Sequence, residues 1–143
     1  ADPGAELVLA AHKLGARVKP LVGPSSILLG LMASGLNGQR FAFQGYLPQE
    51  THERSNKLKQ LETESRKLQQ TQIWIETPYR NTAMLMACIQ SLAPQTLLCL
   101  GIDLSLPSEF ISTLSIAQWR KLYPNEAACN SLQNRPTVFL LLA

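Results

Sequence analysis

The sequence predicts an α/β fold: a single three-layer-like domain with a roughly five-stranded mixed sheet flanked by helices. Segments with apolar residues at helical spacing alternate along the chain with short apolar segments of strand character. The 143 residues are 45% hydrophobic and 16% charged, which excludes a disordered polymer and is enough for one domain with a real core. No apolar run approaches the roughly 18 residues that a membrane-spanning helix needs, so no membrane association is expected.

The N-terminal part predicts a helix followed by a strand. Residues 4–15 carry apolar side chains at helical spacing, and Gly15 stands where a helix usually ends. Asp2-Pro3 is typical of a helix start, because aspartate caps and proline fits the first turn. Residues 18–22 are short and β-like, and they end at the bend Gly23-Pro24-Ser25-Ser26.

The middle of the chain alternates in the same way. A strongly apolar helix is expected over 27–35, and alternating aromatic residues predict a strand over 41–47. Residues 50–69 mix both charge signs around a narrow apolar face, which is typical of a surface helix. Residues 73–75 form a strand, and residues 76–80 form the turn after it.

The C-terminal part supplies the rest of the sheet. A helix is predicted over 80–92, and the continuous apolar run 96–102 predicts a central strand. A short strand over 109–114 and a short helix over 116–122 follow. The next residues are polar and are expected to be irregular, and residues 136–143 close the chain as an apolar strand that begins with proline.

Composition excludes several functions. The net charge of +3 is mild, whereas a domain that holds nucleic acid unaided usually shows a denser basic stripe. Cys88, Cys99 and Cys129 form no CxxC pair, so no metal site or disulfide framework is expected, and reduced thiols favour a cytoplasmic protein. His12 and His52 lie far apart, and no Ser/His/Asp set can be assembled, so no catalytic residue is named.

The bend Gly23-Pro24-Ser25-Ser26 is the most informative candidate site. A predicted strand ends there and a helix begins, and ligands of open α/β sheets bind outside the carboxyl ends of strands. Free N–H groups at the helix start attract anions such as a carboxylate. Ser25 or Ser26 could bind a ligand or simply cap the helix. The bend is not a phosphate-binding P-loop, because GxxxxGK[ST] is missing.

A second turn, Glu76-Thr77-Pro78-Tyr79-Arg80, carries ionisable groups at a strand end. Glu76 could bind a ribose hydroxyl or a cationic group, and Arg80 could reach a phosphate or pair with Glu76. Asp103 follows the next apolar strand in a similar place, where it could instead cap the following turn.

Together, these residues resemble the tetrapyrrole (corrin/porphyrin) methylase superfamily, and most closely its branch of small-subunit rRNA cytidine 2′-O-ribose methyltransferases. The resemblance implies a two-domain enzyme that uses S-adenosylmethionine, is typically a homodimer and acts on rRNA. It also implies that residues 1–143 are the C-terminal domain plus the last turn of an N-terminal one, so that this fragment alone is inactive. The segments that carry it are Asp2-Pro3-Gly4, Val22-Gly23-Pro24-Ser25-Ser26, Ala33-Ser34-Gly35-Leu36, Arg40–Pro48 and Glu76–Arg80.

The resemblance also implies roles for individual residues. The methionine part of the cofactor would lie near the 24–26 bend, and its nucleoside near the 76–77 turn. Its adenine would contact backbone just after the 96–102 strand and at the closing strand. Arg80 would face the substrate. No metal is expected. The implied cofactor-binding residues are Pro24, Ser25, Ser26, Glu76, Thr77, Leu104, Ser105 and Leu142.

The sequence departs from this branch in two places. Tyr79 stands where a histidine is expected, and residues 103–109 are less basic than the usual loop. These departures keep open a second hypothesis, a catalytically degenerate module of the same fold that only binds the cofactor. A third is a dimerisation module that uses the apolar helix over 27–36.

Overall fold

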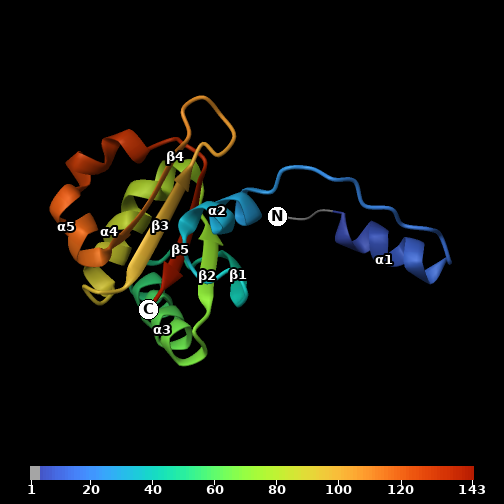
Figure 1. The fold of residues 1–143 in the computed structure, drawn as a ribbon, viewed down its shortest axis with the longest axis horizontal. Coiled ribbons are helices and arrows are strands. Elements are labelled where there is room, and N and C mark those ends of the chain that lie inside the picture. The colour runs from blue at the N-terminus through green and yellow to red at the C-terminus, as the bar shows by residue number, and fades with distance from the viewer. Residues whose placement is uncertain (1–3) are drawn as a thin grey trace.

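The computed structural model describes residues 4–143, and in them a five-stranded sheet forms the centre (Figure 1). Strand β1 runs parallel to β2, β5 runs antiparallel to both β2 and β3, and β4 runs antiparallel to β3. The strands β1, β2 and β3 therefore point the same way, and their carboxyl ends meet at one edge. The predicted mixed sheet is confirmed. Its order is β1 (Phe41–Tyr46), β2 (Thr71–Ile75), β5 (Thr137–Leu142), β3 (Leu97–Ile102), β4 (Phe110–Ser115).

The inner strands are apolar on both faces, which is why their sequences show little polar alternation. On β5, Phe139 faces one layer of helices and Leu140 faces the other. Trp74 of β2 stacks on Phe139, with ring centroids 5.7 Å apart and planes 8° from parallel. The run over β3 is paired on both sides, as expected for a central strand.

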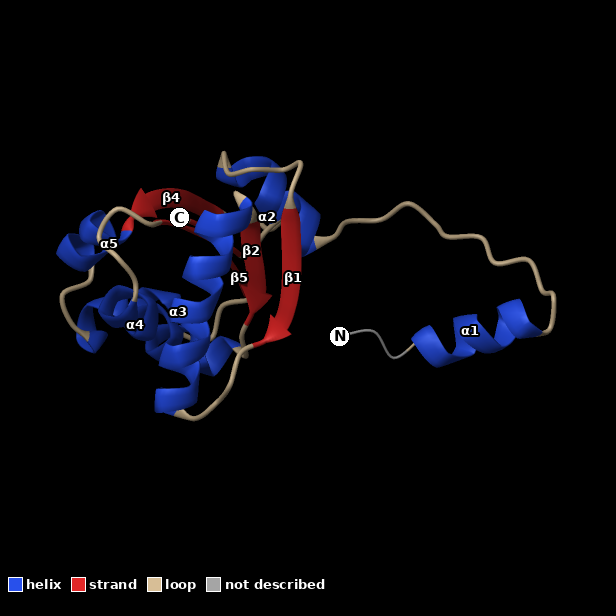
Figure 2. Cartoon of the chain, turned by 90° about the horizontal axis from the view of Figure 1, so that it is seen from below, coloured by secondary structure: helices blue, strands red, loops and turns tan. Residues whose placement is uncertain are grey.

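One face of the sheet is covered by most of the helices and contains the larger core (Figure 2). Leu58 and Leu61 are fully buried on the apolar stripe of α3, and Trp119 on that of α5. Trp119 also donates its Nε1–H to the carbonyl of Leu98 at 2.8 Å. The layer consists of α3 (Thr51–Leu68), α4 (Asn81–Ser91), α5 (Ile116–Leu122) and the 3₁₀ helix η2 (Glu126–Leu132).

The opposite face is covered by one short helix, α2 (Ser26–Ser34). It ends at Gly35, whose left-handed φ of +69° suits glycine. Gly30 lets α2 lie close to β5, because a Cβ there would stand 2.8 Å from Val138 Cγ1. The three layers of the predicted architecture are thus α2, the sheet, and the α3–α4–α5 layer.

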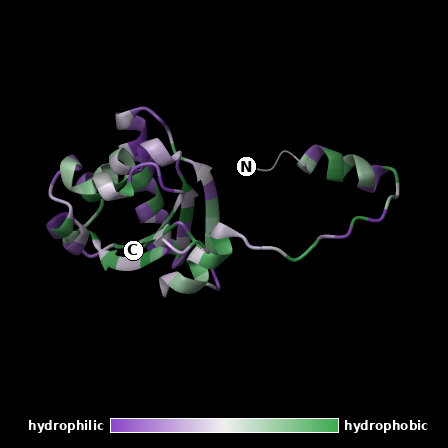
Figure 3. Cartoon of the chain, turned by 90° about the horizontal axis from the view of Figure 1, so that it is seen from above, coloured by the Kyte–Doolittle hydropathy of each residue, from purple (hydrophilic) through white to green (hydrophobic). Residues whose placement is uncertain are grey.

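The N-terminal arm, residues 4–25, extends away from this body (Figure 1). Helix α1 (Ala5–Lys13) contains no buried residue, although it has green, apolar stretches in Figure 3. Leu14 and Leu21 are each 86% exposed. Among residues 4–143, no helix is both long and apolar enough to cross a bilayer.

Two predictions about local structure need correction, and one cannot be compared. The strand predicted over residues 18–22 does not form, because no neighbouring strand offers the hydrogen-bond ladder that a strand needs. Part of the stretch expected to be irregular before β5 is the 3₁₀ helix η2. The helix start predicted at Asp2-Pro3 lies outside the described residues.

Candidate functional site

A cavity of about 380 Å³ opens at the edge of the sheet where β2 and β3 end and β5 begins. The first residue of α2, Ser26, bounds one side. This is the edge at which open α/β sheets usually bind ligands. The walls are mainly apolar, formed by Ile75, Gly101, Leu104, Leu106, Pro136 and Val138.

Glu76 brings a carboxylate to the wall directly after β2, and it is only 5% exposed. Its Oε1 accepts hydrogen bonds from the Thr77 N–H at 2.7 Å and the Thr77 hydroxyl at 3.1 Å. Its Oε2 lies 3.1 Å from Nη2 of Arg80, in the turn η1 (Pro78–Arg80). Arg80 thus forms the ion pair with Glu76 that the sequence suggested as one of its two roles.

Asp103 brings a second carboxylate directly after β3. Oδ2 accepts hydrogen bonds from Arg135 Nε and from the Ser108 hydroxyl, each at 2.8 Å. The bond from Arg135, followed by that from Ser108, lowers the pKa of Asp103 below its usual value. A turn-capping role would supply only a local partner such as Ser108. The carboxylate is also held by Arg135, which is 32 residues away in the sequence.

The cavity brings together some of the predicted site residues and not others. Ser26, Glu76 and Leu104 line it. Ser25 caps α2 by position only, because its side chain makes no cap hydrogen bond. The bend is exposed or half-buried rather than sealed in the core, but no strand precedes it. The lining does not include Pro24, Ser25, Thr77 or Ser105, which are close to lining residues in sequence.

Leu142, which was expected beside the adenine, does not line this cavity. Strand β5 runs antiparallel to β2 and β3, so its carboxyl end lies at the opposite edge of the sheet. Leu142 pairs with Leu97, at the start of β3. The amino end of β5 lies at the cavity instead, with Thr137 and Val138 among its lining residues.

The sequence did not reveal which distant residues support the cavity. Asn81, at the start of α4, is 1% exposed and donates from Nδ2 to the Arg135 carbonyl at 2.6 Å and to the Thr137 hydroxyl at 3.0 Å. This ties the start of β5 to α4. A polar residue at a helix start is ordinarily taken as a cap, so only its partners, more than 50 positions away, identify this role.

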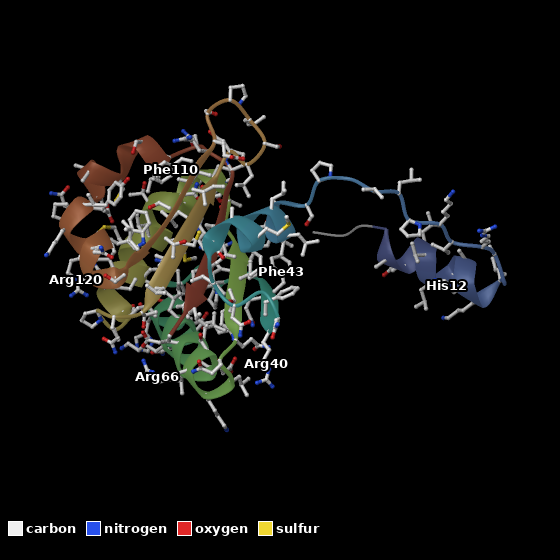
Figure 4. The ribbon with its side chains drawn as sticks, in the orientation of Figure 1. His12, Arg40, Phe43, Arg66, Phe110 and Arg120 are labelled. Carbon is white, nitrogen blue, oxygen red and sulfur yellow. The ribbon has the colours of Figure 1, made fainter. Side chains whose placement is uncertain are left out.

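Within residues 4–143, no cluster of three or more metal-ligating side chains occurs. Cys88, Cys99 and Cys129 are buried, and burial raises the pKa of each thiol. His12 lies on α1, remote from the cavity (Figure 4). Arg40 and Arg66 lie at the end of the body opposite the β3–β4 loop.

The fold of this chain is similar to that of solved methyltransferases, among them one named for uroporphyrin. The methyltransferase CobJ aligns with 96% of this chain and 56% of its own, with a TM-score of 0.56 and 17% identity. Uroporphyrin-III-C-methyltransferase from Thermus thermophilus aligns with 99% of this chain and 58% of its own, with a TM-score of 0.54 and 16% identity.

At the level of sequence, the chain is similar to proteins named ribosomal RNA small subunit methyltransferase I. The protein from Vibrio cholerae is 32% identical over 117 residues, which are 82% of this chain and 39% of that protein. The one from Pseudomonas aeruginosa is 32% identical over 142 residues, 99% of this chain and 48% of that protein. The chain thus spans about half the length of these relatives or less. No family model matches it. The resemblance seen in the motifs is confirmed.

Proposed function

We propose that this chain is the cofactor-binding C-terminal part of an S-adenosylmethionine-dependent methyltransferase that acts on ribosomal RNA. The observation that carries the proposal is the cavity at the carboxyl ends of β2 and β3, with the start of α2 beside it. The relatives named as rRNA methyltransferases support the reaction and the substrate.

The lining fits the parts of such a cofactor. The mainly apolar lining suits a flat base, and Gly101 lets Val138 and Leu104 pack closely over β3, because a Cβ there would stand 3.0 Å from Val138 Cγ1. Glu76 lines the cavity with a carboxylate, the kind of group that accepts a hydrogen bond from a ribose hydroxyl, although its Oε2 is buried against Arg80. Ser26 can supply a hydroxyl or its backbone N–H to the amino-acid part.

When bound, the cofactor supplies a methyl group on a sulfonium centre. The residues of this chain bind and orient it, and the rate gain comes from proximity and alignment with the acceptor. Glu76 is held by Thr77 and Arg80, so its carboxylate keeps one position. Arg80 is 15% exposed on its side chain, so we assign it to the cavity rim, where it can also contact the substrate. No residue in the described part is assigned as a general base.

We further propose that residues 1–143 form the C-terminal domain together with the last turn of a preceding domain. The arm supports this division, because α1 and the following residues expose apolar side chains and bury none on the body. In this arrangement the other half of the cofactor pocket comes from the preceding domain. The same resemblance favours a cytoplasmic homodimer. Exposed Leu28 and Met32 on α2, with Phe41 and Phe43 on β1, are apolar surface suited to a second copy.

The binding step is tested by titrating the chain with S-adenosylhomocysteine and following backbone amides by NMR. We expect shifts at Glu76, Gly101, Leu104 and Val138. Amides of Leu142, at the far edge, serve as the internal control and should not move. Saturable shifts elsewhere with none at the cavity would contradict the assigned site.

The reaction is tested on the full-length protein with small-subunit rRNA and labelled S-adenosylmethionine. We expect label on the 2′-hydroxyl of a cytidine, located by nuclease digestion and mass spectrometry. Light scattering on the same sample checks the homodimer. Cofactor binding without transfer to rRNA or to a corrin precursor would favour the degenerate module instead. The observation in favour of that alternative is the β3–β4 loop, which carries no basic side chain.

A further inference from the structure

The β3–β4 loop, residues 103–109, forms one wall of the cavity and stands at the top of the body in Figure 1. Its backbone is unusual, because Asp103 and Ser105 have left-handed φ values of +50° and +69° without being glycine. Such conformations persist only where surrounding contacts hold them. The conformation turns Leu104 and Leu106 toward the cavity.

The polar groups of this loop are bound to one another. The Ser105 N–H donates to Glu109 Oε2 at 2.7 Å, and the Ser108 hydroxyl donates to Asp103 Oδ2 at 2.8 Å. The N–H of Leu106 donates to the Asp103 carbonyl at 2.9 Å. The loop therefore presents Leu104 and Leu106 to the cavity, beside the carboxylate of Asp103.

Arg135 connects this loop to the segment before β5. Its Nε donates to Asp103 Oδ2 at 2.8 Å, and its Nη2 donates to the Ser108 carbonyl at 2.6 Å. The guanidinium does not line the ligand cavity. It lines a second hollow behind the wall, together with Ser108 and Glu109. One planar guanidinium thus holds two points of the loop, at Asp103 and Ser108, from outside the cavity.

We propose that Arg135 is a positioning residue of the ligand cavity: acting through Asp103 and Ser108, it holds Leu104 and Leu106 in the wall against which the cofactor's base packs. The inference rests on the proposed function for the identity of the ligand. We call the contacts of Arg135 with Asp103 and Ser108 the clip, and its existence depends only on the hydrogen bonds described above.

Three single variants of the chain and one double variant test it. Arg135→Met removes both contacts, and Arg135→Lys keeps the charge but cannot make both bonds. Arg120→Met is the matched control, because Arg120 also donates from Nη2 to a backbone carbonyl, that of Ile89 at 2.7 Å, in the α4–α5 layer. Thermal unfolding first confirms that each variant is folded, and Arg135→Lys carries the test if Arg135→Met is not.

The first measurement is amide hydrogen exchange without ligand. The N–H groups of Ser105 and Leu106 should exchange about tenfold faster in Arg135→Met, the loss expected for one charge-assisted hydrogen bond. They should be unchanged in Arg120→Met. Equal exchange in Arg135→Met and the unaltered chain would overturn the clip.

The second measurement is the Kd for S-adenosylhomocysteine. We expect about tenfold weaker binding for Arg135→Met, about threefold for Arg135→Lys, and less than twofold for Arg120→Met. Adding Asp103→Asn to Arg135→Met should weaken binding no further, because both changes break one contact. If Arg135 only stabilised the fold, the variants would lower the melting temperature, but the two substitutions would show no such non-additive effect on the Kd.

The outcomes separate the two proposals. Normal binding by Arg135→Met, beside normal binding by the unaltered chain, would overturn the positioning role and leave the proposed function standing. No binding by the unaltered chain would contradict the proposed function and the ligand role of the wall, whereas the exchange measurement would still decide whether Arg135 holds the loop.

Discussion

Gly30 shows how a single side-chain atom limits the approach of a helix to a sheet. No left-handed backbone requires glycine there, but Val138 of β5 leaves no room for a Cβ. The residue therefore sets the distance between α2 and the cavity edge.

Gly30→Ala should lower the free energy of unfolding. Overpacking of a core contact costs about 1–3 kcal/mol, and the better helix propensity of alanine returns about 1 kcal/mol. We expect a net loss of up to about 2 kcal/mol by urea unfolding. Gly38→Ala is the control, since a Cβ there meets nothing within 4 Å. Equal stability of both variants would contradict the close contact.

Asp103 should make stability depend on acid pH. Its folded-state pKa lies below the unfolded value of about 3.9. The ion pair with Arg135 therefore contributes stability above that pH, and the contribution is lost as the pH falls through the folded-state pKa. Asp103→Asn should lower the urea midpoint at pH 7 and reduce its drop between pH 5 and pH 3, roughly the window around that value.

The comparison for this pH effect is Glu6→Gln, an acidic residue on α1, which buries none of its residues. That variant should follow the pH dependence of the unaltered chain. A drop of the same size in Asp103→Asn and Glu6→Gln would show that the ion pair with Arg135 does not stabilise the fold.

Among the elements, α5 and β2 each place a fully buried tryptophan in the same core layer, Trp119 and Trp74. Trp119 donates its indole N–H to the Leu98 carbonyl. The indole N–H of Trp74 has no hydrogen-bond partner among the described residues. The two tryptophans are therefore equally buried, but only Trp119 makes an indole hydrogen bond among the described residues.

Trp119→Phe should destabilise the chain more than Trp74→Phe. Both lose a similar volume, but only the first loses a buried hydrogen bond, a difference of about 0.5–1.5 kcal/mol. Urea unfolding at pH 7 measures both. A larger loss for Trp74→Phe would mean that its stacking on Phe139 outweighs the hydrogen bond.

The start of α3 illustrates local control at the same scale. The carboxylate of Glu50 accepts from the N–H groups of His52 and Glu53, at 2.9 and 2.7 Å. These bonds lower the pKa of Glu50 and begin the helix at Thr51. The predicted boundary at residue 50 lay within one residue of the observed one, because capping uses only neighbours in sequence.

At the scale of the whole molecule, we expect the stability of the body to be independent of the N-terminal arm. Deleting residues 1–22 should leave the melting temperature within about 2 °C, because the removed part from residue 4 onward contains no buried residue. Calorimetry of both chains measures this. A loss of more than about 5 °C would show that the arm packs on the body in solution.

The fold was largely predictable because the helices and strands of each layer have characteristic patterns of apolar residues in the local sequence. The spacing of Leu58 and Leu61 predicts the buried stripe of α3, and the apolar run over 96–102 predicts an inner strand. The site was predictable in part for the same reason, since Ser26 and Glu76 stand at element ends. The clip between Asp103 and Arg135 was not, because nothing in either local pattern identifies its partner.

By itself, the sequence determined the helices, the inner strands, the bends at which a ligand could bind, and the family they resemble. Those features depend on spacings of a few residues. The tertiary structure alone decided that residues 18–22 have no strand partner, and that β5 runs antiparallel. That direction carries Leu142 away from the cavity and brings Thr137 and Val138 to it. Strand pairing and ion pairs join residues far apart in the chain, and their geometry exists only once the sheet has formed.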